Sequence, residues 1–332
     1  MTMRRLKKWL RYRRDSLQWT FRKMRHFRRR YQPQLTQIPT YDGSGQTVHP
    51  CVLFFPESWK GYRYWMAFTP YPDGNDQFEN PSLVVSGDGV RWFVPPGLHN
   101  PIVDTPGEAV DFLSDPHIMV HDDVMYLIYR EQLRSVSPPE ERWFMLTSRD
   151  GVLWGEKREL FRFENSIHVS ACMLHDGKRF VLYYVTYGLR RFYAIERRTC
   201  AGDPTDGANW SDPQRVELEG LEKGVDPWHI EVFLQPEGTW DMLLTTCTGI
   251  GGVGGRLHYA ASRDGLSWRT TEQPFIEPTH AFDSHWHYKA TMVRVREGRY
   301  KLWYSAMSVR GTWHTLYLQV VKQGNSLVPV SR

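Results

Sequence analysis

After residue 45 the apolar residues of this chain occur in short runs, and turn residues separate one run from the next. Runs such as Cys51–Phe55, Tyr62–Thr69 and Ser82–Val85 are rich in aromatic and β-branched residues and are bounded by Gly, Pro, Asp and Ser, which predicts β-strands. Nothing approaches 18 consecutive apolar residues, so no membrane-spanning helix is expected. The pattern indicates a protein built from many short strands.

A short phrase, Ser-x-Asp-Gly-x-x-Trp, recurs along the chain and organises these strands. It begins at Ser86, Ser148 and Ser262, and a worn copy, Asp206–Trp210, lies between the second and the third. From Trp to Trp the steps are 62, 56 and 58 residues, a period typical of repeat architectures. Asp-Gly favours a tight turn, because Gly tolerates positive φ and Asp bonds to nearby backbone. Each phrase therefore predicts the hairpin between the last two strands of a four-stranded unit.

Five such units fill the chain from residue 46 to residue 330. A closed ring of four-stranded sheets is a β-propeller, whose radial closure leaves only short sheet edges. We therefore predict an all-β fold, a five-bladed β-propeller with an N-terminal basic α-helical arm at residues 1–31 and a linker at 32–45. The predicted blades span about 46–95, 111–162, 166–219, 226–276 and 283–330.

The charge is concentrated at the N-terminus. Residues 1–31 hold 13 Lys or Arg and one acid, so this arm carries +12, and the chain's net +5 leaves −7 on residues 32–332. Leu6, Leu10 and Leu17 begin a rough apolar stripe between basic faces, which predicts an amphipathic helix. Such an arm suits an anionic membrane surface, an acidic protein partner or a sister subunit, including assembly into an oligomer or a virion. Nucleic acid is less favoured, because no recognisable DNA-binding motif accompanies the arm.

Targeting signals and cysteine usage add a cellular context. The basic start has no apolar segment behind it, so no signal peptide is expected. The four cysteines show neither C-x-x-C nor disulfide-type spacing. We expect them to be reduced, as in a protein made in the cytoplasm, with association at a membrane surface or in a virion left open.

The first strands of a propeller line a central funnel, so residues at their starts converge on one pocket. In this chain these starts carry polar and aromatic residues where a strand is ordinarily apolar. We therefore predict a binding pocket there. The candidate residues are His49 in blade one, Asp115 and His117 in blade two, Asp226, Trp228, His229 and Glu231 in blade four, and Trp286, His287 and Lys289 in blade five.

Residues 46–330 resemble glycoside hydrolase family 43 and related propeller enzymes. The resemblance is carried by Ser114-Asp115-Pro116-His117, by Glu231 behind Trp228-His229, and by the repeated hairpins. The resemblance implies cleavage of a glycosidic bond by paired carboxylates, in which one protonates the leaving oxygen and the other activates water or attacks. On that basis Glu231 is the candidate general acid, Asp115 the candidate base or nucleophile, and Asp226 the residue that tunes the pair or orients substrate. Glu231 has an alternative role as an ion-pair partner of Arg130 or Lys289.

The chain departs from that family at two strand starts. Family 43 enzymes usually supply an Asp from the first strand of blade one, where this chain has His49, and blade three has Ser170 in place of an acid. Either the catalytic set has migrated or the chemistry is lost. Glu79 and Glu131 are the candidates for a migrated carboxylate, and a His also serves as a general acid or base.

The candidate residues also suit two other kinds of ligand, a metal ion and a sugar ring. His49, His117, His229 and His287 come from four blades and, with Asp115 or Glu231, would suit Zn²⁺ or another transition metal. The carboxylate mechanism requires no cofactor. A metal ion in the channel is an alternative to that mechanism. Sugar rings stack on aromatic planes, for which Tyr71, Trp228 and Trp286 are the candidates.

The leading hypothesis is a carbohydrate-active protein, a glycoside hydrolase acting on a glycan or surface polysaccharide in the funnel. The alternative, from a different class, is a non-catalytic glycan-binding or structural module of a larger assembly such as a virion. Fold alone decides neither, because propellers host many functions. The arrangement of the carboxylates at the funnel distinguishes them.

Overall fold

The computed structural model describes residues 31–105, 110–164, 166–188, 193–248, 253–278 and 281–330. The predicted basic helix lies at residues 1–31 and so falls, except for Tyr31, outside the described residues. Within the described part, no helix is long and apolar enough to cross a bilayer. Helical structure is limited there to three 3₁₀ turns, so the predicted all-β class is confirmed.

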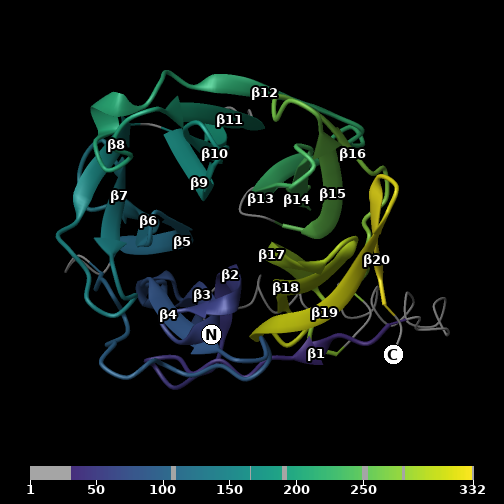
Figure 1. The fold of residues 1–332 in the computed structure, drawn as a ribbon, viewed down its shortest axis with the longest axis horizontal. Coiled ribbons are helices and arrows are strands. Elements are labelled where there is room, and N and C mark those ends of the chain that lie inside the picture. The colour runs from purple at the N-terminus through teal and green to yellow at the C-terminus, as the bar shows by residue number, and fades with distance from the viewer. Residues whose placement is uncertain are drawn as a thin grey trace, which may run out of the picture.

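Five blades of antiparallel strands are arranged radially around a central axis, and they form four sheets because blades three and four are joined into one (Figure 1). Blade one contains β2 (Thr47–Trp59), β3 (Tyr62–Pro70) and β4 (Ser82–Ser86), with η1 (Pro72–Gly74) and η2 (Asp76–Phe78) between the last two strands. Blade two contains β5 (Phe112–His121), β6 (Val124–Leu133), β7 (Glu140–Ser148) and β8 (Arg158–Glu164). Blade three contains β9 (Ser166–His175), β10 (Phe180–Gly188), β11 (Tyr193–Cys200) and β12 (Gln214–Glu219), with η3 (Gly207–Asn209).

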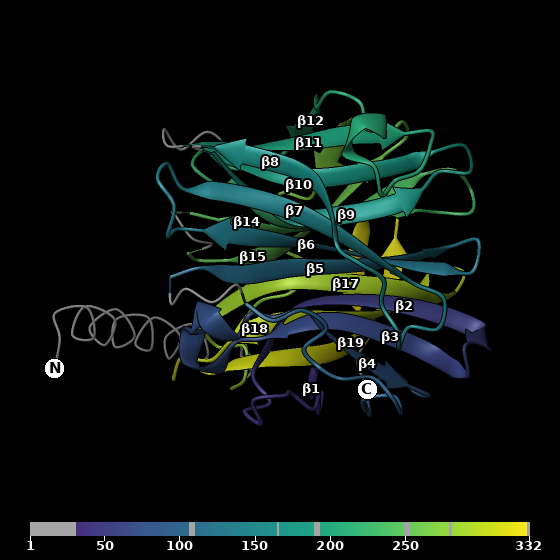
Figure 2. The same cartoon turned by 90° about the vertical axis from the view of Figure 1, so that its left-hand side faces the viewer.

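Blade four contains β13 (Asp226–Leu234), β14 (Trp240–Cys247), β15 (Arg256–Ser262) and β16 (Ser267–Thr270), and its last strand pairs in parallel with β12 of blade three. Blade five contains β17 (Trp286–Arg296), β18 (Arg299–Met307), β19 (Trp313–Gln323) and β20 (Ser326–Pro329). A side view shows the strands of successive blades stacked across the molecule (Figure 2). The fold is a five-bladed β-propeller.

The ring is closed by the two ends of the described chain. Strand β1 (Gln34–Leu35) pairs antiparallel with β19, so blade five is completed by residues from the start of the sequence. Thr36 donates both its backbone N–H and its hydroxyl to the carbonyl oxygen of Thr315, at 3.1 and 2.6 Å. Thr36 and Ile38 are buried, so this part of the segment predicted as a linker packs against the propeller.

The apolar core lies between the blades rather than within one of them. One cluster joins Trp65 of blade one to Tyr129 of blade two, and a second joins Tyr64 of blade one to Trp303 of blade five. Similar clusters lie between the other neighbouring blades. Burial of these side chains supplies the main driving force that holds the ring together.

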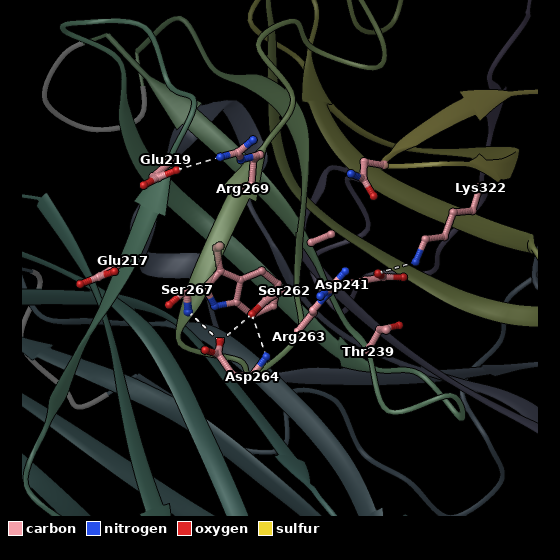
Figure 3. A pocket seen from close by; sticks show the side chains of 13 residues that line it. Glu217, Glu219, Thr239, Asp241, Ser262, Arg263, Asp264, Ser267, Arg269 and Lys322 are labelled. Atoms are coloured by element: carbon pink, nitrogen blue, oxygen red, sulfur yellow. Dashed lines mark hydrogen bonds and ion pairs between the residues drawn. The ribbon is translucent and has the colours of Figure 1, made fainter.

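The repeated phrase forms the same turn in blades one, two and four. In blade four the hydroxyl of Ser262 accepts the N–H of Gly265 at 2.9 Å, and Asp264 Oδ1 accepts the N–H groups of Leu266 and Ser267 at 2.8 Å. Figure 3 shows the bonds of Asp264 to Ser262 and Ser267. The predicted hairpin connections are thus local turns capped by the Ser and Asp side chains.

Each of these turns also contacts a neighbouring blade. Gly89, at φ +78°, lies against the buried ring of Trp303 in blade five, and a Cβ added at Gly89 would lie 2.8 Å from Trp303 Cζ2. The indole Nε1 of Trp303 donates to the carbonyl oxygen of Gly89 at 2.8 Å. The equivalent Gly265 carbonyl accepts the Tyr183 hydroxyl of blade three at 2.7 Å. The phrase therefore connects blades as well as strands.

Candidate functional site

The innermost strands, β2, β5, β9, β13 and β17, surround the central axis (Figure 1), and each has an irregular register near its start. His49, Asp115 and Ser170, in the first strands of blades one, two and three, have φ of +56°, +52° and +64°. Non-Gly residues rarely adopt this conformation, which costs about 1–3 kcal/mol and occurs most often at functional sites. The strain is located at the strand starts where the sequence predicted a pocket.

His49, Asp115 and His229 come together at this level of the channel. Asp115 Oδ1 lies 3.6 Å from His49 Nε2 and 3.3 Å from His229 Nδ1, and all three side chains are at most 2% exposed. His49 Nδ1 lies 3.0 Å from Thr69 Oγ1. No described group forms a hydrogen bond of good geometry with His49 Nε2 or with either ring nitrogen of His229. Both histidines thus have a ring nitrogen that lies near the Asp115 carboxylate and makes no hydrogen bond of good geometry with a described group.

The protonation states of these three groups follow from their surroundings. Burial lowers the pKa of His49 and of His229, so both rings are neutral near pH 7. Burial alone would raise the pKa of Asp115, but His49 and Arg130 hold it well below its usual range. We therefore describe this set as two neutral imidazoles and one carboxylate.

Arg130 fixes the orientation of Asp115. Its Nε donates to Asp115 Oδ2 at 2.7 Å and to Ser114 Oγ at 2.6 Å, while its Nη1 lies 3.3 Å from Glu141 Oε2. The backbone N–H of Ser170 donates to Asp115 Oδ1 at 3.2 Å. An ionised carboxylate held by these two donors is pre-organised as a ligand, base or nucleophile and has no proton to give.

Glu79 is a second carboxyl group at the same level. It follows η2 directly, is buried, and its Oε1 lies 3.6 Å from His49 Nδ1. Burial, followed by the charge of Asp115, raises the pKa of Glu79 well above its usual range. The turn that carries it is held in place by Tyr41, whose hydroxyl donates to the carbonyl oxygen of Phe78 at 3.0 Å. Glu79 therefore has the properties of a proton carrier.

Two residues further along the same strands, a second layer of side chains faces the channel. Cys51 Sγ lies 3.3 Å from His117 Nδ1 and 3.6 Å from Glu231 Oε1, and His117 Nδ1 lies 3.5 Å from the same oxygen. Lys289 Nζ lies 3.5 Å from Glu231 Oε2. Burial would raise the pKa of Glu231, but Lys289 and His117 lower it. These neighbours favour the carboxylate, whereas the predicted general acid needs a raised pKa.

The predicted histidines are divided among three separate groups. His49 and His229 share Asp115, and His117 belongs to the layer of Cys51 and Glu231. His287 Nε2 instead lies 3.6 Å from Asp283 Oδ2, and that oxygen accepts the hydroxyl of Tyr304 at 2.9 Å. These contacts therefore do not favour a single ion bound by all four histidines.

The remaining predicted residues are distributed around the channel mouth and beyond it. Tyr71 and Trp286 are partly exposed and pack with Trp313 and Tyr288 near the start of β2. Trp228 is buried, 5.6 Å from Tyr187 between ring centroids, and Asp226 is partly buried, which raises its pKa. Glu131 is buried, with Oε2 3.4 Å from Lys157 Nζ, an ion pair outside both channel layers.

Sequence reasoning missed Cys51 and Tyr288. The Tyr288 ring lies 4.4 Å from that of His229 and 5.4 Å from that of His49. The signal for Cys51 was present, because Cys51, His117 and Glu231 each follow a first-layer residue by two positions, the period of a strand.

Two other pockets lie away from the first layer. One, of about 520 Å³, is lined by charged and polar residues of the outer strands, including the ion pairs Arg269–Glu219 and Lys322–Asp241 (Figure 3). The other, of about 750 Å³, is lined by the later halves of the innermost strands, with His117 and Glu231 among its residues. The innermost strands begin at the first layer, so the second pocket opens at the opposite end of the channel.

No protein-family profile matches the chain. The chain is 27% identical to an A type blood N-acetyl-α-D-galactosamine deacetylase of Flavonifractor plautii over an alignment of 315 positions, and the match covers 79% of this chain and 40% of that relative's length. The chain thus spans less than half of that protein.

Solved structures show the same fold. An N-acetylgalactosamine deacetylase from F. plautii, in complex with blood group B trisaccharide, superposes with a TM-score of 0.76 at 22% identity, covering 87% of this chain and 94% of that one. A xylan β-1,4-xylosidase from Bacillus halodurans superposes at 0.65 and 15% identity, covering 91% and 56%. A thermostable family-43 glycoside hydrolase superposes at 0.60 and 12% identity, covering 86% and 93%. The predicted resemblance to the propeller glycosidases of family 43 and their relatives is confirmed.

Proposed function

We propose that this protein is a carbohydrate-active hydrolase that removes the N-acetyl group from an amino sugar at the mouth of the channel. The observation that carries the proposal is the set His49, Asp115 and His229, in which a histidine stands where family 43 glycosidases usually have an aspartate. Two imidazoles and one carboxylate suit a divalent metal better than the paired-carboxylate cleavage of a glycoside. The F. plautii relative is an N-acetylgalactosamine deacetylase, which agrees with amide hydrolysis on a sugar.

The donor set fits a divalent ion in charge and in spacing. Both imidazoles are neutral and have buried nitrogens without a hydrogen-bond partner among the described groups, and Asp115 is ionised. Tetrahedral ligation at about 2.0–2.2 Å places neighbouring N and O ligands about 3.4 Å apart. The N–O separations here are 3.3 and 3.6 Å. When bound, such an ion would supply Lewis-acid polarisation of the amide carbonyl and activation of water.

The chain's own residues would then perform the proton transfers and the positioning. Glu79 takes a proton from the attacking water as its oxygen bonds to the acetyl carbon, and returns that proton to the amine nitrogen as the C–N bond breaks. Acetate and a free amino sugar leave. Its raised pKa suits both halves of this exchange near neutral pH. Arg130 keeps Asp115 ionised and correctly oriented throughout.

The aromatic residues at the mouth would bind the sugar ring. Tyr71 lies 5.5 Å from Trp313 between ring centroids, and Tyr288 lies 5.2 Å from Trp313 and 4.4 Å from His229. The buried ring of Trp313 thus connects Tyr71 at the rim to Tyr288 beside the proposed ligands and holds both in place. Aromatic faces pack against the C–H faces of sugars, which places the substrate beside Glu79 and Asp115.

One observation favours glycoside hydrolysis as a second candidate. Asp115 is ionised while its charge helps to raise the pKa of Glu79, and two carboxyl groups with opposite shifts are the pattern of a glycosidase base and acid. In that case Glu79 would protonate the glycosidic oxygen. The two candidates differ in product, because one releases acetate and the other a new reducing end.

The test is a panel of N-acetylated glycosides and glycans, assayed for acetate and for reducing ends with and without a chelator. We expect acetate without reducing ends, loss of activity on chelation and recovery with a divalent metal. Glu79→Gln should lower activity by about 10²–10⁴-fold with sugar binding retained. The control Glu131→Gln also removes a buried carboxylate, but one paired with Lys157 away from the channel, and should leave activity unchanged.

Chelator-insensitive release of reducing ends, abolished by Glu79→Gln, would replace deacetylation by glycoside hydrolysis. Glycan binding without either product would make the protein a binding module, the non-catalytic alternative raised from the sequence.

A further inference from the structure

The layer of Cys51, His117 and Glu231 is not used by the proposed reaction. These residues lie on β2, β5 and β13, in blades one, two and four, and their side chains are almost fully buried. Their ligand-type atoms, Sγ, Nδ1 and Oε1, all lie within 4.8 Å of one another. We propose that they form a second metal site, chemically distinct from the first, that holds a borderline-soft divalent cation such as Zn²⁺ and links three blades.

The spacing of the three atoms is that of a tetrahedral face. With Zn–S of about 2.3 Å and Zn–N or Zn–O of about 2.0–2.2 Å, tetrahedral angles place neighbouring ligand atoms about 3.4–3.6 Å apart. The observed separations are 3.3 Å for Sγ–Nδ1, 3.6 Å for Sγ–Oε1 and 3.5 Å for Nδ1–Oε1. One thiolate, one imidazole and one carboxylate would occupy three positions and leave the fourth to water.

The outer contacts of His117 and Glu231 match those of metal ligands. His117 Nε2 donates to the carbonyl oxygen of Met173 at 2.8 Å, so Nδ1 is the ring nitrogen that faces Cys51 and Glu231 and that would bind a metal after losing its proton. A second hydrogen bond of this kind fixes the tautomer of most metal-bound histidines. Lys289 Nζ, which is fully buried, lies beside the other oxygen of Glu231 and leaves Oε1 for the ion.

The proposed site can release protons when the ion binds, and the ion has a route to it from solvent. Binding of the ion would displace the Cys51 thiol proton and the Nδ1 proton of His117 to solvent, so the metal gains a thiolate and a neutral imidazole and the net charge of the layer stays the same. His117 and Glu231 line the 750 Å³ pocket at the end of the channel opposite the first layer. An ion can therefore enter without passing the proposed catalytic site, and the two sites fill independently.

The thiolate distinguishes this site experimentally, because His49, Asp115 and His229 offer no sulfur. The full chain is stripped of metal, titrated with Co²⁺, and monitored for the sulfur-to-cobalt charge-transfer band in the near ultraviolet. We expect one equivalent of this band in wild type and in Asp115→Asn, and its loss in Cys51→Ser. The matched control is Cys172→Ser, which removes a buried thiol whose Sγ is hydrogen-bonded to the backbone of Val232 and should keep the band.

A folded wild-type chain without the band, or a band that survives Cys51→Ser or is lost in Cys172→Ser, would overturn the proposal. Should Cys51→Ser fail to fold, X-ray absorption of the zinc-loaded wild type decides, since it must contain one sulfur scatterer at about 2.3 Å per ion at the second site. Failure of the proposed deacetylation is separate, because it is scored by acetate release and by Glu79→Gln.

Discussion

Gly89→Ala tests whether the repeated turn joins neighbouring blades. At φ +78° an alanine costs about 1 kcal/mol in backbone strain. The new Cβ would also lie 2.8 Å from Trp303 Cζ2, in a fully buried ring that has little room to move, and overpacking of this kind costs about 1–3 kcal/mol. We therefore expect a loss of about 2–4 kcal/mol in the free energy of unfolding.

The matched control is Gly177→Ala, at φ +91° with nothing within 4 Å of the added Cβ. It carries the backbone strain alone and should cost about 1 kcal/mol. Both variants are compared with wild type by urea unfolding, with equal slopes required before the midpoints are converted to free energies. If Gly89→Ala lowers the free energy of unfolding by no more than Gly177→Ala does, the contact between the turn and Trp303 does not stabilise the fold. In a Trp303→Phe background the cost of Gly89→Ala should shrink, because the ring atoms it meets are gone.

Three other outcomes follow from the contacts described above. Arg130→Met leaves Asp115 and Glu141 as buried carboxylates without their guanidinium, so it should destabilise the fold by about 3–5 kcal/mol in the same unfolding assay; a loss below about 1 kcal/mol would contradict the proposed network. Backbone N–H groups of Ser267 and Leu266 lower the pKa of Asp264 to about 2, so its stabilising effect is full above its unfolded value of 3.8 and is lost as the pH falls toward 2. The stability of wild type relative to Asp264→Asn should therefore decline between these two pH values and stay constant above them; a constant difference throughout would disprove the assignment. Deletion of residues 1–31 should abolish salt-sensitive binding to anionic vesicles or dissociate an oligomer, and an unchanged protein in both assays would exclude both interpretations of the basic arm.

The fold could be predicted because its signal is local and repeated. Ser262, Asp264 and Gly265 specify their turn through hydrogen bonds within six residues, and the same bonds recur in blades one and two. The period of these turns, together with the strand runs of residues 283–330, is sufficient to count blades. The contact of Gly89 with Trp303 could not be foreseen, because it joins residues that are far apart in the sequence and depends on ring closure.

The site was predictable in its location but not in its grouping. Strand starts converge in a propeller, which is why His49, Asp115 and His229 were found. The sequence does not reveal where a bulge shifts the strand, and a shift of one residue moves every side chain to the other face. For that reason only the structure could show that His117 and His287 lie outside the first layer. The pKa of Glu231 likewise depends on Lys289, a residue of another blade.

The closure of blade five by β1 has a consequence for how the chain folds. Thr36 and Thr315 are 279 positions apart, so their contact has one of the longest sequence separations that the chain permits. Contacts of this kind raise the contact order and slow folding, since the entropy of closing the loop is lost before the contact forms. During synthesis the first four blades can emerge and pair locally, while the ring stays open until residues near 320 leave the ribosome. Until then the exposed edges of blades one and four are where the nascent chain is most exposed to aggregation.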